Sequence, residues 1–292
     1  MAKGFLNDSD DLIDICRDNV FKAVFTRNTP ASQGALSKLI SALIYREVSV
    51  TSISVNEPPI DNLRDRQIRF DINCMAENGE LVNIEMCLNP VSFEPARLEY
   101  YAGKLFIGQD IRGIGKSYND LKQAFQIAIL ARERFFDDEV FLHTFEYYDP
   151  SHKVPLNGKC RIITMELSKL EKVIEKPIKE MSVQEQWGVY FRYLTDKGKR
   201  ETINGIIEQE EGIAMASDVL ISISKDQIER ARLMSEEKYE LDLQSWITTA
   251  RQEGKQEGKQ EGRKEGKQEG KQEIIELLKR GKSPEEIIRE YS

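Results

Sequence analysis

The apolar residues of the first fifty positions recur at the spacing of helices and then at that of a strand. Between residues 19 and 46 they lie three and four positions apart, and the polar stretch NTPAS at 28–32 interrupts them. The two apolar sets are Val20, Phe21, Val24 and Phe25, and then Leu36, Leu39, Ile40, Leu43 and Ile44. Residues 49–55, SVTSISV, alternate between apolar and polar side chains instead. The pattern therefore predicts two amphipathic helices followed by a strand.

Helical and strand patterns alternate again in the next part of the chain. PARLEYYAGKLFIG at 95–108 has helical spacing, and Pro95 suits a first turn. Three segments rich in β-branched and aromatic residues are typical of strands: AFQIAIL (124–130), FLHTFEYYD (141–149) and RIITMEL (161–167). Residues 171 to about 250 have helical patterns throughout. We therefore expect an α/β (α+β) core, with a mixed central sheet flanked by helices, over residues 1–170, and a helical extension packed on it over 171–250.

The chain continues into a low-complexity tract with the repeat EGKQ, at residues 251–273. Its five glycines stand at every fourth position, at 254, 258, 262, 266 and 270. In a helix they would cost about 4–5 kcal/mol relative to alanine, but they would also let a second helix come close. We therefore expect a homo-oligomer formed through this tail, with a disordered linker as the alternative. Residues 274–292 are expected to form two short helices, because Gly281 suits a helix end and SPEE at 283–286 is a capping box.

Composition narrows the chemistry that these elements can carry. The 292 residues have a net charge of -8, the wrong sign for a protein that coats nucleic acid without specificity. Four cysteines without C-x-x-C spacing and only two histidines leave little material for a zinc site or a Ser-His-Asp triad. A metal would accordingly be a hard ion held by carboxylates. No stretch has the pattern of a signal peptide or a membrane span, so we expect a cytoplasmic protein with no membrane partner.

The segment RFDINCMAENGELVNIEMCL, residues 69–88, has the pattern of two strands around a tight turn. A two-residue turn at 78–79 would mix polar and apolar side chains on both faces, whereas a three-residue turn at 77–79 gives one apolar face. On that face the three-residue turn pairs Phe70 with Met86, Ile72 with Ile84 and Cys74 with Val82. On the other face it places Asp71 opposite Glu85, Asn73 opposite Asn83 and Arg69 opposite Cys87.

In this register Asp71 and Glu85 form a pair of like charges, and such a pair is destabilising when the side chains are directly opposite. A divalent cation would compensate them, since Mg²⁺ is typically held by one or two carboxylates together with phosphate oxygens. The alternative is a solvated face on which both are ordinary surface acids. The spacing by itself leaves both interpretations open.

Several motifs together resemble the recombination-promoting nuclease and putative transposase family of the PD-(D/E)XK nuclease superfamily. They are NVFKAVF (19–25), Asp71 with the Asn-Gly turn, IEMC (84–87), RLEYYAGKLF (97–106), SYNDLKQAFQIAIL (117–130), TMELSKL (164–170), QEQWGVYFRYL (184–194) and the EGKQ tail. The resemblance implies a restriction-endonuclease-like core and a Mg²⁺-dependent DNA endonuclease. It also implies a role in DNA recombination or mobile-element biology, with Asp71 and Glu85 as the metal ligands.

One motif position departs from the family pattern. The residue two after the glutamate is usually lysine in the superfamily and glutamine in the family, whereas this chain has Cys87. A thiol is a weak hydrogen-bond partner and does not position a water as an amide or an ammonium does. Arg69, on the same face of the hairpin, is our candidate for the missing donor. The alternative function is a nuclease-fold protein that binds DNA or protein partners without cutting.

Two helices supply the remaining candidates. The resemblance places Arg97, at the start of the helix after the hairpin, at the border of the active site, where it would hold phosphate or orient Glu85. A solvated helix face is the alternative. Asp18 and Lys22 in the first helix also match the family pattern, and the superfamily sometimes supplies another acid there. The candidate catalytic residues are therefore Asp71, Glu85, Cys87, Arg69 and Arg97.

Overall fold

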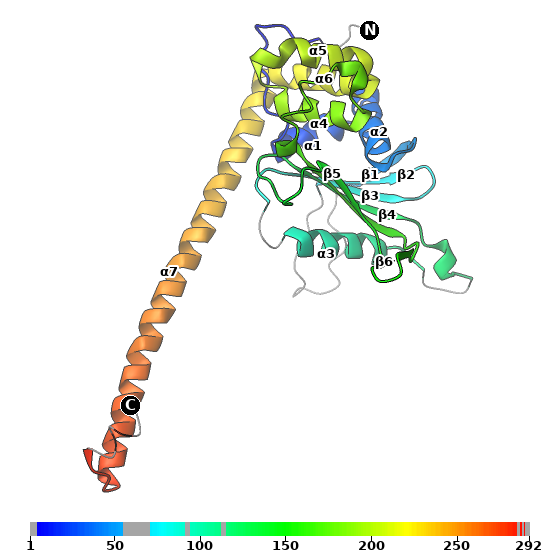
Figure 1. The fold of residues 1–292 in the computed structure, drawn as a ribbon. Coiled ribbons are helices and arrows are strands. Elements are labelled where there is room, and N and C mark those ends of the chain that lie inside the picture. The colour runs from blue at the N-terminus through cyan, green and yellow to red at the C-terminus, as the bar shows by residue number, and fades with distance from the viewer. Residues whose placement is uncertain are drawn as a thin grey trace. The chain divides into compact units, whose positions relative to one another are not determined.

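The computed structural model describes residues 5–54, 71–90, 94–111 and 115–284, together with 287 and 289. By its internal packing the chain divides into two units, Met1–Leu233 and Met234–Ser292. The first unit contains a mixed six-stranded sheet with helices against both of its faces (Figure 1). The predicted α/β architecture with a mixed central sheet is confirmed.

The two amphipathic helices expected near the start of the chain are α1 (Asp18–Phe25) and α2 (Pro30–Ile44). They are separate because Thr29 caps α2, its side chain accepting a hydrogen bond from the backbone N–H of Ser32 at 3.2 Å. Pro30 then occupies the first position of α2, where its missing N–H costs nothing.

The strand order of the sheet is β1-β2-β3-β4-β8-β5. These strands are β1 (Val50–Ser54), β2 (Ile72–Ala76), β3 (Leu81–Cys87), β4 (Ala124–Leu130), β5 (Leu142–Phe145) and β8 (Cys160–Glu166). The central β3, β4 and β8 are parallel, and the outer pairs are antiparallel. The expected hairpin register is confirmed, since Ile72 pairs with Ile84 and Cys74 with Val82. Gly79 has a φ of 82° in the three-residue turn, a conformation that glycine adopts without strain.

One expected strand is divided in the structure. Residues 141–149 form β5 and, beyond Phe145, a separate strand β6 (Tyr148–Asp149), which pairs with β7 (Val154–Pro155) in a second, two-stranded sheet. The prediction of one strand was wrong because the two halves pair with different partners, β5 with β8, and β6 with β7 across a turn after Asp149. The carboxylate of Asp149 accepts hydrogen bonds from the backbone N–H groups of Ser151 and His152, which stabilise this turn.

The two faces of the six-stranded sheet have different covers. Val82, Ile84 and Met86 of β3 belong to the main core, together with buried residues of α1, α2 and the later helices. Those helices are α4 (Val183–Tyr193), α5 (Arg200–Gln209) and α6 (Glu211–Lys225). The described residues also form four short 3₁₀ helices, η1 (Tyr118–Asp120), η2 (Leu167–Lys169), η3 (Ile178–Glu180) and η4 (Lys197–Lys199). On the opposite face lies α3 (Glu94–Ile107), whose Leu98 packs on Ala128 (Figure 1). Because side chains alternate along a strand, Glu85 and its neighbours at 83 and 87 point toward the α3 face.

The last helix, α7 (Gln227–Lys279), contains 53 residues and includes the whole EGKQ tract. Residues 274–279, expected as the first of two short terminal helices, are the last turns of α7, because no proline interrupts the chain before them. α7 is followed by a turn at Gly281, which has a φ of 85° and donates its N–H to the carbonyl of Leu278. The second expected short helix lies mostly outside the described residues. Among the helices that the structure describes, none combines the length and the apolar character needed to cross a membrane.

Candidate active site

The two acids of the hairpin lie side by side where β2 begins and β3 ends. Asp71 directly precedes β2, and the observed register places it opposite Glu85 of β3. One carboxylate oxygen of Asp71 accepts a hydrogen bond from the backbone N–H of Met86, at 3.3 Å. The structure therefore brings together the two residues that the sequence predicts as metal ligands.

A lysine of α1 lies against Asp71. The ammonium nitrogen of Lys22 is 3.0 Å from Asp71 Oδ1 and 2.7 Å from Asp18 Oδ2. Asp18 and Lys22 are one helical turn apart and so share a face of α1. The second oxygen of Asp18, Oδ1, is buried and has no hydrogen-bond partner among the described residues. Helix α1 thus adds one cation and one further acid to the site.

An arginine of α3 holds Glu85 in place. Arg97 Nη2 is 3.1 Å from Glu85 Oε2, and Arg97 Nε donates a hydrogen bond to Glu94 Oε1 at 2.7 Å. Glu85 and Glu94 are 2% and 1% exposed, so this guanidinium compensates two buried carboxylates. The geometry matches one of the two roles expected for Arg97, the orientation of Glu85.

Two buried amides continue from Glu85 across the sheet. Asn83 Nδ2 donates hydrogen bonds to Glu85 Oε1 at 3.2 Å and to Gln126 Oε1 at 2.9 Å. Both amide side chains are fully buried. The sequence-based prediction missed Gln126 and Glu94. A signal for Gln126 was present, because it is the one polar residue in the strand AFQIAIL and a buried polar group needs a partner.

Burial and neighbouring charges raise the pKa of both hairpin acids. At Asp71, burial and then the negative charge of Asp18 raise the pKa to about 8, although Lys22 opposes this. At Glu85, burial raises the pKa to about 7 against the lowering effect of Arg97. Both carboxyl groups therefore bind protons close to neutral pH, and one more cation beside them would displace those protons.

The motif position occupied by Cys87 lacks a strong donor. Its side chain is half-buried beside the small apolar cluster of Leu98, Ala128 and Leu130. Burial, and then the charge of Glu94, raises the pKa of the Cys87 thiol to about 12, so the sulfur stays protonated at neutral pH. Arg69, predicted to supply the missing donor, lies outside the described residues.

The donor set of the site suits a hard divalent cation. Asp71 and Glu85 offer carboxylate oxygens, the ligands that Mg²⁺ prefers, and Asp18, which shares Lys22 with Asp71, has a further oxygen without a hydrogen-bond partner among the described residues. Within the described ranges, no three His, Cys, Asp or Glu side chains converge as a complete metal cage. The residues therefore fit an ion that is held by two carboxylates and completed by water or substrate oxygens.

Comparison with protein-family models gives a match that covers residues 15–250. The matching family is described as PD-(D/E)XK nuclease family transposase. The match includes the site residues from Asp18 to Gln126 and ends just before the EGKQ tract. No curated protein and no solved structure gives a significant match.

Proposed function

Because the chain belongs to the family of PD-(D/E)XK nuclease transposases, we propose that it is a Mg²⁺-dependent endonuclease that hydrolyses phosphodiester bonds of DNA. The observation that carries this proposal is the pair Asp71 and Glu85, two largely buried acids on neighbouring strands. Each has its own cation, Lys22 for Asp71 and Arg97 for Glu85. The family description supports a role in DNA recombination or mobile-element biology.

Asp71 and Glu85 are the residues that would hold the metal. When bound, Mg²⁺ lowers the pKa of a water molecule and neutralises charge on the phosphate. Arg97 fixes one oxygen of Glu85, and the buried amide of Asn83 fixes the other. Lys22, with its ammonium 3.0 Å from Asp71, is our candidate for contact with a phosphate oxygen of DNA. It would supply the cationic donor that the motif lacks at position 87.

The test of the nuclease proposal is nicking of supercoiled plasmid by the full chain with Mg²⁺. Glu85→Gln keeps the shape of the side chain and removes its charge, so we expect nicking to fall by roughly 100-fold or more. Glu175→Gln is the matched control, since it makes the same change at an exposed position outside the site and outside α7 and should nick like wild type. Equal nicking by wild type and Glu85→Gln would overturn the proposal.

Binding of DNA or protein partners without cutting is the second candidate function. The neutral, half-buried thiol of Cys87 favours it, because such a group does not position an attacking water. Cys87→Gln introduces the side chain usual in the family. A wild-type protein that binds DNA but does not nick it, together with nicking by Cys87→Gln, would support this alternative over the nuclease.

We also propose that α7 joins two copies of this chain. Residues 251–273 are almost entirely exposed. Apart from the adjacent residues and the local backbone of the helix, no atom of the described residues lies within 4 Å of a Cβ built at any of the five glycines. Large apolar side chains are exposed at both ends of the tract, namely Tyr239, Trp246 and Ile247 before it and Ile274, Ile275 and Leu278 after it. Burial of these side chains against a second α7 would offset the low helix propensity of the glycines.

Sedimentation of the full chain over a concentration series tests this association. Replacing the five glycines with alanine favours the helix by about 4–5 kcal/mol but adds a methyl group wherever two helices approach closely. We therefore expect a dimer for wild type and a more helical but weaker dimer for this variant. Alanine at the five glutamines 252, 256, 260, 268 and 272 is the control. A wild-type protein that sediments as a monomer at every concentration would refute the association.

A further inference from the structure

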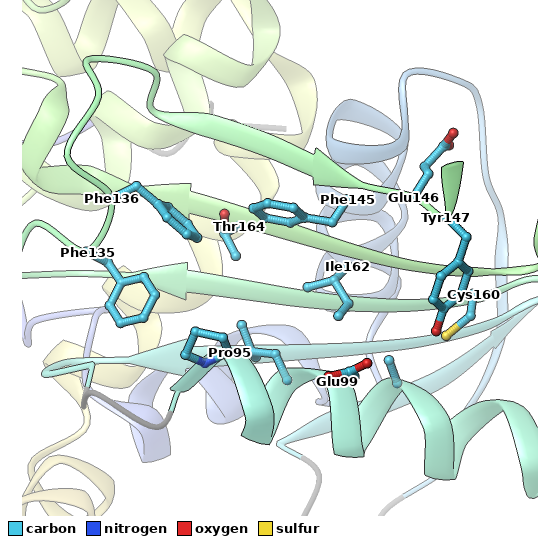
Figure 2. Close-up of a pocket in the computed structure, with 12 residues that line it drawn as sticks. Pro95, Glu99, Phe135, Phe136, Phe145, Glu146, Tyr147, Cys160, Ile162 and Thr164 are labelled. Atoms are coloured by element: carbon cyan, nitrogen blue, oxygen red, sulfur yellow. The ribbon is translucent and has the colours of Figure 1, made fainter. Parts of the chain in front are cut away.

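A pocket lies between α3 and the outer strands of the six-stranded sheet (Figure 2). Its volume is about 270 Å³. Phe136, Phe145 and Tyr147 form an aromatic wall, and Pro95 and Leu98 of α3 form part of the other side. Phe145 and Tyr147 are 42% and 52% exposed, so their rings have surface available for a ligand. The site described above does not use any of these aromatic side chains.

The pocket lies on the same face of the sheet as Glu85. Glu85 of β3 pairs with Ala128 of β4, and Ala128 pairs with Thr164 of β8, which lines the pocket. Paired residues on neighbouring strands point to the same face, and the strands lie about 4.8 Å apart, so the Cα atoms of Glu85 and Thr164 are roughly 10 Å apart. A single nucleotide spans such a distance between its phosphate and its base.

A buried hydroxyl in the pocket has no partner. Thr164 is 1% exposed, and its Oγ1 makes no hydrogen bond to any described residue. Leaving such a group unsatisfied costs roughly 1–3 kcal/mol, which a ligand with a donor or acceptor would recover. One carboxylate also lines the pocket, that of Glu99 on α3. The carboxylate of Glu146 points away from the pocket and pairs with Arg161 at 2.6 Å (Figure 2).

These features fit a nucleobase better than the sugar-phosphate part of DNA. A base is flat, so its faces can stack on Phe136 and Phe145, while its polar edge can bond to Thr164. The carboxylate of Glu99 would repel a phosphate. It would accept a hydrogen bond from the exocyclic amino group of cytosine, adenine or guanine, whereas thymine has no such group.

We propose that this pocket binds one unstacked base of the DNA strand whose phosphate lies at Asp71 and Glu85. The inference rests on the proposed nuclease function and specifies the substrate class of the same site. A base reaches such a pocket only after leaving the helical stack, so single-stranded or locally unpaired DNA is preferred over intact duplex. Amino-bearing bases are preferred over thymine because of the Glu99 carboxylate.

A single-stranded oligonucleotide that contains 2-aminopurine, a fluorescent base that stacking quenches, tests the pocket. It is titrated with the full chain in Ca²⁺ in place of Mg²⁺, so that the strand stays intact. Phe145→Ala removes a stacking surface and should raise the Kd roughly 5- to 100-fold and abolish the quenching. Thr164→Val keeps the side-chain shape, removes a hydroxyl that has no partner in the free protein, and should raise the Kd roughly 2- to 10-fold. Tyr118→Ala is the control, an aromatic side chain that is 79% exposed and does not line the pocket.

The outcomes separate this inference from the nuclease proposal. If wild type binds the oligonucleotide and nicks plasmid, but neither pocket variant changes the Kd or the fluorescence, the base pocket is refuted and the nuclease stands. If wild type neither binds nor nicks DNA, both fall. Thermal unfolding of each variant shows whether a loss of binding comes from the altered pocket or from a loss of folded protein. If Phe145→Ala does not fold, the binding measured for Thr164→Val tests the pocket.

Discussion

Glu85→Gln should make the protein more stable at neutral pH while it removes nuclease activity. The Glu85 side chain is 3% exposed, and burial raises its pKa from 4.5 to about 7. As the pH rises from 4.5 to about 7, Glu85 loses its proton in the unfolded chain before it does so in the folded chain. The free energy of unfolding of the wild type therefore falls over this range and stays lower at every higher pH. At about 1.36 kcal/mol for each unit of pKa, the deficit is roughly 3 kcal/mol. Glutamine carries no charge at any pH, so the Glu85→Gln variant does not lose this stability.

Urea unfolding of both proteins from pH 5 to pH 8, with EDTA present, measures this difference. We expect Glu85→Gln to exceed wild type in free energy of unfolding by less than about 1 kcal/mol at pH 5 and by roughly 3 kcal/mol at pH 8. The exposed change Glu175→Gln should follow wild type at every pH. A difference between Glu85→Gln and wild type that stays constant with pH, or a wild type that is the more stable protein at pH 8, would show that burial of the Glu85 charge is not the cause.

Three further predictions concern the metal, Lys22 and a helix crossing. Millimolar Mg²⁺ should raise the melting temperature of wild type by several degrees and leave that of Glu85→Gln nearly unchanged, because an ion that binds only the folded state stabilises it. Lys22→Met should destabilise the protein by roughly 1–3 kcal/mol at pH 9, where Asp71 is ionised, and by less at pH 6, as urea unfolding at the two values would show. Gly212→Ala should cost roughly 1–3 kcal/mol in the same assay, since its Cβ would lie 2.4 Å from a side chain of α2. Gly103→Ala, with open space around the added methyl group, should be neutral or stabilising.

The local elements of the first unit follow from sequence patterns, with few exceptions. The hairpin is the clearest case, because one apolar face admits only one register, and that register predicts the Asp71 and Glu85 pair. The helices at 30–44 and 94–107 also follow from apolar spacing and from proline at their first turns. The division of residues 141–149 did not follow, because both halves have strand composition and only pairing with different partners separates them.

The compensation of the acids depends on contacts between distant parts of the chain. From the sequence, a metal ion that compensates the two opposed carboxylates and a solvated face with two ordinary surface acids were both open. In the folded chain Lys22 of α1 reaches Asp71 and Arg97 of α3 reaches Glu85, so each acid already has a protein partner. No periodicity predicts these pairs, since they depend on how α1 and α3 pack against the sheet.

Along each strand, the chain itself determines which side chains share a face, because alternation and turn length are local properties. It thereby determined that Asp71, Asn83 and Glu85 would lie together. The order of the strands is a property of the packed sheet, and it alone placed Glu85, Ala128 and Thr164 in one row and set the aromatic pocket beside the acids. The physical reason is that parallel strands are joined by long connections, so their neighbours are chosen by burial of the whole core and not by any local pattern.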